Sequence, residues 1–162
     1  KPSSGLHRVV AMVLSEQQLE VRKALRAAAK RFNMSPDILD AIGYVETRWK
    51  MGLVNNTGGD AARGGAFGPT QITEKTARQH GFLGEMQRIN CNPAIAGEWS
   101  CKILMGRPGG APQTAEDAGA WWNAGRSSYD KLGPDHVTRK DYVPKLVAAL
   151  ELVKKEPPDG RV

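Results

Sequence analysis

Residues 35–48 read SPDILDAIGYVETR, and this stretch predicts a helix whose apolar face ends in a glutamate. Ser35 suits the N-cap, because its hydroxyl can accept a hydrogen bond from a first-turn N–H, and Pro36 and Asp37 are typical first-turn residues. Apolar residues then recur at helical spacing, at Ile38, Leu39, Ile42 and Val45. We expect the helix to run to about Arg48.

Glu46 is the residue of this helix that bears on chemistry. It lies seven residues after Leu39 and four after Ile42, so the three share one helix face. Apolar neighbours disfavour the ionised form of a carboxyl group and raise its pKa, which is what a general acid needs near neutral pH. A single glutamate near a helix end is more often a solvated surface residue, so the interpretation depends on further motifs.

Further helices predicted around this one make the expected fold mainly helical. Ser15 and Gln18 form a capping box for a helix over residues 15–32. Spacing and caps predict others over residues 73–80, 93–105, 114–123 and 141–154, the last with Val143, Leu146, Val147, Leu150 and Val153 on one face. Residues 52–68 have too few spaced apolar residues for a helix, and we expect a long loop or a short irregular hairpin. One domain is expected over residues 1–162, with its core at about 15–154, a loose C-terminal tail and a small irregular or β-like insertion.

Composition restricts the class of protein and partner. The 162 residues, 40% hydrophobic and 25% charged, are ordinary for a globular domain. The net charge of +6 favours an acidic partner, such as nucleic acid, an anionic lipid surface or an anionic cell-wall polymer. No apolar run reaches the roughly 20 residues of a membrane span, and residues 9–14 are not a complete signal peptide. Because the chain begins at Lys1, we expect it to be processed or cut from a larger protein.

Cysteine and histidine spacing predicts no metal site and no cofactor. Cys91 and Cys101 fit neither a zinc nor a CxxC redox pattern, and His7, His80 and His136 are scattered. On the helix expected from Pro93, Cys101 lies about 12 Å along the axis, so a disulfide requires the chain at Cys91 to fold back. A bridge and two small buried thiols both remain open.

Three motifs follow Glu46 in order: GGAFGPTQI at residues 64–72, WWNAG at 121–125 and RKDYV at 139–143. With them the chain resembles the soluble-type lytic transglycosylases, which share a fold with goose-type lysozyme. Members of that family carry a helix ending in Glu-Ser, a Gly-Ala-x-Gly-Leu-Met-Gln-Ile loop, an Asn-Ala-Gly turn after an aromatic residue and a late Tyr-Val helix. The resemblance covers about residues 35–150. It departs where Pro69-Thr70 replaces Leu-Met and Thr47 replaces Ser.

The resemblance implies a lysozyme-like α+β fold and a one-carboxylate cleavage of peptidoglycan. Glu46 would protonate the bond between N-acetylmuramic acid and N-acetylglucosamine. It would then take the proton of the sugar's own 6-hydroxyl, which closes a 1,6-anhydro ring without water. This scheme is related to the substrate-assisted exceptions to two-carboxylate catalysis. By resemblance, the substrate would be bound by Thr47, Gly65, Ala66, Phe67, Gly68, Gln71, Asn123 and Tyr142.

These roles have physical reasons and also plain structural alternatives. Asn123 and Gln71 each offer a donor and an acceptor, as an acetamido group requires. Gly65 and Gly68 allow close approach of the backbone to a ligand, and they equally serve a turn. Asn123 alternatively caps a helix, and Tyr142 alternatively belongs to the core.

Asp60 makes the reaction type ambiguous. Goose-type lysozymes carry a Gly-Asp element in this part of the chain, and a second carboxylate about 6.5–9.5 Å from the acid can position water for hydrolysis. The alternative function is therefore a muramidase in which Asp60 assists. We prefer the simpler interpretation, in which Asp60 bonds its own backbone in a turn.

Other surface features suggest competing partners. Trp49, Trp99, Trp121 and Trp122 could stack on sugars, but two adjacent tryptophans on a helix cannot face the same way, so one of that pair is expected in the core. The basic helix over residues 22–31 could track phosphates, which makes a nucleic-acid-binding protein the competitor from another class. We prefer a solvated helix face, and so expect no nucleic-acid partner. A monomer is expected, acting on the cell wall from the periplasm, after secretion, or as a phage protein.

Overall fold

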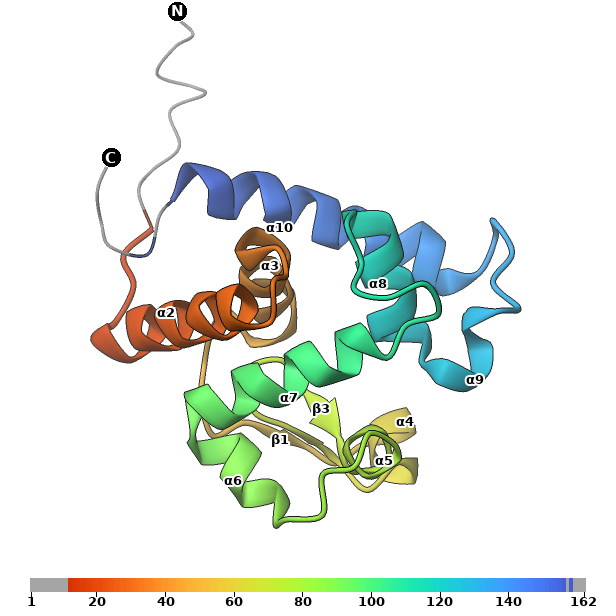
Figure 1. Cartoon of the computed structure of the whole chain (residues 1–162), viewed down its shortest axis with the longest axis horizontal. Coiled ribbons are helices and arrows are strands. Elements are labelled where there is room, and N and C mark those ends of the chain that lie inside the picture. The colour runs from red at the N-terminus through yellow and green to blue at the C-terminus, as the bar shows by residue number, and fades with distance from the viewer. Residues whose placement is uncertain (1–11, 157, 159–162) are drawn as a thin grey trace, which may run out of the picture.

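The computed structural model describes residues 12–156 and residue 158. These residues form a mainly helical structure with one small three-stranded sheet (Figure 1). Part of the apolar run at residues 9–14 and most of the C-terminal tail lie outside the described residues.

The helices include all those expected from spacing and caps, and three more. The main ones are α2 (Glu16–Arg31), α3 (Pro36–Thr47), α5 (Glu74–Gln79), α7 (Pro93–Met105), α8 (Ala115–Ala124) and α10 (Val143–Lys155). The short helices α4 (Gly58–Ala62), α6 (Met86–Cys91) and α9 (Arg126–Tyr129) were not predicted. Helices this short are held by tertiary packing more than by their own sequence. A π-helical turn, η1 (Thr138–Tyr142), leads directly into α10.

Capping side chains explain where the two central helices begin. The Ser15 hydroxyl accepts from the Gln18 N–H at 3.1 Å, and the Gln18 side chain accepts from the Ser15 N–H at 2.9 Å, which confirms the capping box. The Ser35 hydroxyl accepts from the N–H of Ile38 at 3.2 Å, as expected for the N-cap of α3. Local sequence therefore determines both helix starts.

The glycine-rich stretch forms most of the sheet. Strands β1 (Val54–Asn55), β2 (Ala66–Phe67) and β3 (Ile72–Thr73) pair antiparallel in that order, with Val54 opposite Phe67 and Phe67 opposite Ile72. Of the two alternatives expected for residues 52–68, a long loop or a short irregular hairpin, β1 and β2 form the hairpin. The expectation that this stretch contains no helix is wrong, because α4 lies in the connection between β1 and β2.

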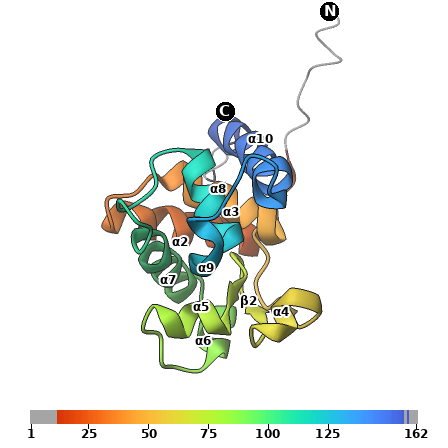
Figure 2. The ribbon, with the colours of Figure 1, turned by 90° about the vertical axis from the view of Figure 1, so that its right-hand side faces the viewer.

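Two apolar clusters hold the structure together. The larger lies among α2, α3, α7, α8 and α10, and the smaller packs the sheet against α5, α6 and the other side of α7. Trp122 is partly buried against both clusters, so it joins the helical part to the sheet part. Figure 2 shows α4, α5, α6 and β2 grouped on one side, with α8 and α9 facing them.

A buried ion pair joins α2 to α3. The guanidinium of Arg22 bonds both carboxylate oxygens of Asp40 at 2.8 and 3.1 Å, and both side chains are almost fully buried. Arg26 adds a second contact to Asp40 at 3.0 Å. The expected solvated basic face of residues 22–31 is therefore wrong for Arg22, whose burial is possible because Asp40 neutralises its charge.

Two further expectations are corrected by burial. On α10, Val147 is 37% exposed and Ala149 occupies the buried position, because the buried face follows Val143, Leu146, Ala149 and Val153. Cys91 and Cys101 are both free; Cys101 is buried on α7 while Cys91 is exposed at the end of α6. Within the part of the chain that the structure describes, no helix is long and apolar enough to cross a bilayer.

Candidate active site

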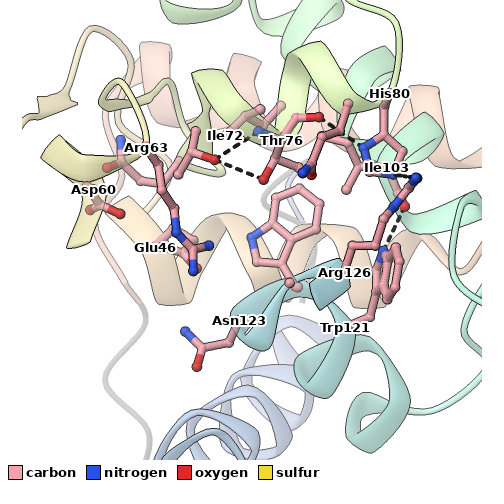
Figure 3. Close-up of a pocket in the computed structure, with 15 residues that line it drawn as sticks. Glu46, Asp60, Arg63, Ile72, Thr76, His80, Ile103, Trp121, Asn123 and Arg126 are labelled. Atoms are coloured by element: carbon pink, nitrogen blue, oxygen red, sulfur yellow. Dashed lines mark hydrogen bonds between the residues drawn. The ribbon is translucent and has the colours of Figure 1, made fainter. Parts of the chain in front are cut away.

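A cleft opens between the helical part of the molecule and the sheet part (Figure 3). Its lining includes Glu46 from α3, Asp60 from α4 and residues 121–123 of α8. Gln71 from the turn before β3, residues 72–73 of β3, and residues from α5 and the start of α9 complete much of the rest. Segments far apart in the sequence therefore meet at this one surface.

Glu46 lies in the last turn of α3, partly buried at the cleft wall. The pKa of its carboxyl is raised to about 7. Burial is the largest cause and raises the pKa, the hydrogen bond from Tyr142 lowers it, and the negative charge of Asp60 raises it. A carboxyl with this pKa can both donate and accept a proton near neutral pH, as the apolar stripe of α3 predicted.

Tyr142 is the direct partner of this carboxyl. Its hydroxyl donates to Oε2 of Glu46 at 2.6 Å, across 96 positions of sequence. Burial raises the pKa of Tyr142 well above its usual value, and the adjacent Glu46 charge and hydrogen bond raise it further. Tyr142 therefore keeps its proton and donates a hydrogen bond to Glu46, while it also belongs to the larger core cluster.

Thr47 holds the end of α3 against the sheet loop. Its hydroxyl donates to the carbonyl of Pro69 at 2.8 Å and accepts from the N–H of Lys50 at 3.1 Å. Arg48 and Trp49 then adopt left-handed conformations, and Trp49 is fully buried, so it is a core residue and cannot stack on a sugar. Thr47 is not part of the cleft lining. Its hydrogen bonds hold the end of α3 and so position the neighbouring Glu46.

The residues from Gly65 to Gly68 also lie outside the cleft lining. Gly68 has φ +81°, and a Cβ there would stand 2.9 Å from the carbonyl oxygen of Ile89. Its N–H donates to Oδ1 of Asn90 at 3.1 Å. Gly65 has φ +95°, Ala66 is buried, and Phe67 packs against the smaller cluster. Both glycines thus adopt left-handed conformations that favour glycine in this turn.

Gln71 and Asn123 line the cleft from opposite walls. The side-chain nitrogen of Gln71 donates to the carbonyls of Leu53 and Gly68 at 3.1 and 3.0 Å, which holds the amide in place. Oδ1 of Asn123 accepts from the hydroxyl of Thr138 at 2.7 Å. The side-chain nitrogen of Gln71 and the side-chain oxygen of Asn123 are thus already bonded. The side-chain oxygen of Gln71 and the side-chain nitrogen of Asn123 are the atoms that could bind a ligand.

Asp60 lines the same cleft as Glu46. The preferred interpretation, a turn aspartate bonded to its own backbone, is not observed: within the described residues its carboxylate accepts no hydrogen bond. Its carbonyl oxygen, and not its side chain, accepts from Gly65. The cleft therefore contains two carboxyl groups, one partly buried and held by Tyr142, the other on a short helix.

The adjacent tryptophans differ as expected. Trp121 is 3% exposed and donates to the carbonyl of Ile103 at 2.8 Å, which makes it the core member of the pair. Trp122 is less buried and donates to the carbonyl of Thr70 at 3.2 Å. Trp99 packs against Phe82 with the smaller cluster and is not part of the cleft.

Sequence motifs did not indicate several cleft residues. Arg63, Thr76, His80 and Arg126 all contribute to the lining. Nε2 of His80 lies 3.1 Å from Arg126, and Nδ1 lies 3.0 Å from the carbonyl oxygen of Thr76. Burial lowers the pKa of His80; its backbone hydrogen bond raises the pKa, and the Arg126 charge lowers it. These residues converge only in three dimensions, so no local signal could identify them.

Comparisons of the chain with models of known families, with curated proteins and with solved structures find no match. The inference about the chemistry of the site therefore rests on its geometry. That geometry offers an acid/base carboxyl, a second carboxylate, two amides and an aromatic wall in one cleft. Within the described residues, no group of three or more His, Cys, Asp or Glu gathers as a metal site would require.

Proposed function

We propose that the protein is a lytic transglycosylase that cleaves the β-1,4 glycan strand of peptidoglycan, with Glu46 as acid and then base. The observation that supports this most is the state of Glu46: one partly buried carboxyl on a cleft, with its pKa raised to about 7 and Tyr142 bonded to it. A group that must give and later take a proton works best with a pKa near the working pH.

The remaining cleft residues fit an amide-bearing sugar. Gln71 and Asn123 supply donor and acceptor groups on opposite walls, suited to an N-acetyl group. The indole of Trp122 adds an apolar surface of the kind on which sugar rings stack. In this proposal the N-acetyl group stabilises the positive charge that develops at the sugar, and the sugar's 6-hydroxyl closes the anhydro ring. A lysozyme-like fold and action at the cell wall belong to the same proposal.

A muramidase is the second candidate, and Asp60 is the observation that favours it. Asp60 lines the cleft with Glu46, and its charge affects the pKa of Glu46. A second carboxylate free of hydrogen bonds could hold the water that attacks in an inverting hydrolysis. The two reactions differ in product: transglycosylation leaves 1,6-anhydro ends, and hydrolysis leaves reducing ends.

Mass spectrometry of the fragments released from purified peptidoglycan tests the proposal. The wild-type chain should release anhydro-ended fragments, and folded Glu46→Gln should lose a factor of at least about 10²–10⁴ in rate. Glu20→Gln, which removes an exposed carboxylate on α2, is the matched control. A folded Glu46→Gln variant that keeps most of its activity would exclude Glu46 from the reaction.

A further inference from the structure

The cleft has a second end, away from Glu46. Figure 3 shows His80, Trp121 and Arg126 together there, while Glu46, Asp60 and Arg63 lie on the other side. A guanidinium only donates hydrogen bonds, so Nε2 of His80 must accept the 3.1 Å bond from Arg126. The ring proton is then on Nδ1, where it donates to the carbonyl of Thr76 at 3.0 Å.

This arrangement orients Arg126 without neutralising it. Arginines elsewhere in the molecule, such as Arg22 and Arg78, are held by carboxylates. Arg126 is held instead by a neutral imidazole, and it forms no ion pair within the described part of the chain. The guanidinium of Arg126 is therefore held in place at the cleft and keeps its full positive charge.

Arg63 is a second unpaired cation on the same surface. Its Nη1 lies 3.5 Å from where a Cβ on Gly125 would stand, so it reaches across to the turn that precedes Arg126. Within the described residues Arg63 also has no carboxylate partner. The cleft thus carries two guanidinium groups against Asp60 and the partly protonated Glu46, and such a surface attracts anions.

We propose that Arg126, oriented by His80 and aided by Arg63, forms a subsite for a carboxylate carried by the glycan strand. The planar guanidinium fork matches a carboxylate in two parallel hydrogen bonds. This inference rests on the proposed function. Two parts of peptidoglycan offer the group: the free lactyl carboxylate of a muramic acid without peptide, and the carboxylates of an attached peptide. A neutral polymer of N-acetylglucosamine offers none.

Binding measured without turnover tests the subsite. In a Glu46→Gln background, calorimetry is carried out with three tetrasaccharides: one of N-acetylglucosamine alone, one with free lactyl carboxylates, and one with peptide stems. We expect the carboxylated ligands to bind more tightly than the neutral one. Arg126→Gln should weaken binding of a carboxylated ligand roughly tenfold, and Arg63→Gln less, with binding of the neutral ligand unchanged. Arg31→Gln, which removes an exposed charge on α2 outside the cleft, should change neither.

The pattern of losses separates the possible outcomes. A loss with the lactyl ligand assigns the subsite to the sugar acid, and a loss restricted to the peptide-bearing ligand assigns it to the peptide. Equal affinity for all three ligands, or an equal effect of Arg126→Gln on neutral and carboxylated ligands, overturns the subsite and leaves the proposed function standing. Failure of all three ligands to bind would contradict the proposed function itself.

Discussion

At the scale of single residues, the pKa of Glu46 depends on the groups that surround its carboxyl. Its neighbours on α3 are apolar, its direct partner is the neutral hydroxyl of Tyr142, and the nearby charge of Asp60 is negative. Burial and a like charge both favour the protonated form, while a hydrogen bond from tyrosine favours the ionised form. The balance gives a carboxyl that exchanges its proton near neutral pH, at a cost to stability that can be measured.

Glu46→Gln should remove part of the pH dependence of folding. The pKa of Glu46 is about 7 in the folded protein and near 4.5 without its surroundings, so the folded state holds this proton more strongly. Its contribution is fully present below pH 4.5 and is lost as the pH rises through about 7. Above that pH we expect Glu46→Gln to be more stable than wild type by up to about 3 kcal/mol, measured by urea unfolding. With Glu20→Gln as control, an equal pH dependence in wild type and Glu46→Gln would contradict the raised pKa.

Tyr142→Phe should move the pH profile of activity upward. The hydroxyl of Tyr142 lowers the pKa of Glu46, so its removal should raise that pKa above its present value of about 7. The alkaline limb of kcat/KM, which reports loss of the acid form, should then shift to higher pH. Stability should fall by about 1 kcal/mol, because one hydrogen bond is lost. A profile that stays in place while activity falls would give Tyr142 a role other than tuning Glu46.

At the scale of elements, α3 is positioned from both ends. The Asp40 carboxylate near its start joins it to Arg22 of α2, and Thr47 at its end joins it to Pro69 of the sheet loop. Glu46 lies beside the second of these contacts. The position of the candidate acid thus depends on bonds made by residues outside the cleft lining.

Arg22→Met should destabilise the protein by about 3–5 kcal/mol, because Asp40 would remain buried with its charge uncompensated except by Arg26. Chemical denaturation measures the loss. The double variant Arg22→Met, Asp40→Leu should recover much of it, because no buried charge then remains. Failure of the double variant to recover would show that packing, including the contact of Arg22 with Trp49, is the larger contribution.

Thr47→Val should lower both stability and activity. The change removes the hydrogen bonds to Pro69 and Lys50 and leaves the Pro69 carbonyl without this partner, which we expect to cost about 1–3 kcal/mol. Thr47→Ser retains the hydroxyl and is the matched control. If Thr47→Val weakens substrate binding and leaves thermal stability unchanged, the side chain contacts substrate, as the resemblance to lytic transglycosylases implies.

At the scale of the whole molecule, function depends on how the helical part and the sheet part face one another. Glu46 and Asn123 come from the helical part, whereas Gln71 and Asp60 come from the sheet part and its α4 insertion. Trp122 packs against both apolar clusters and so helps to set their relative position. In the proposed function, the choice between transglycosylation and hydrolysis depends on residues from both parts.

Asp60→Asn distinguishes a transglycosylase, in which Glu46 acts alone, from a muramidase, in which Asp60 assists. If Glu46 acts alone, Asp60→Asn should keep anhydro products and reduce the rate only a few-fold, roughly the effect of losing one nearby charge. Mass spectrometry of released fragments measures both quantities. A wild-type ladder of reducing ends, lost together with activity in Asp60→Asn, would instead establish the muramidase.

Local sequence predicted where most of the longer helices begin, and it placed Glu46 on an apolar helix face. Ser15 and Ser35 cap the helices expected of them, and Asn92 and Thr114 cap α7 and α8 in the same way, because caps act within one turn of chain. The apolar stripe of α3 likewise predicted a carboxyl with a raised pKa, because helical periodicity is a local property.

The surroundings of the Glu46 carboxyl follow from packing between segments that are distant in the sequence. The bond from Tyr142 to Glu46, the ion pair of Arg22 with Asp40, and the contact of Arg126 with His80 each join residues distant in sequence. The same packing placed Asp60 in the cleft and Thr47 outside it. Such contacts depend on how the helices and the sheet pack across two apolar clusters. No local sequence pattern specifies which distant residues this packing brings together.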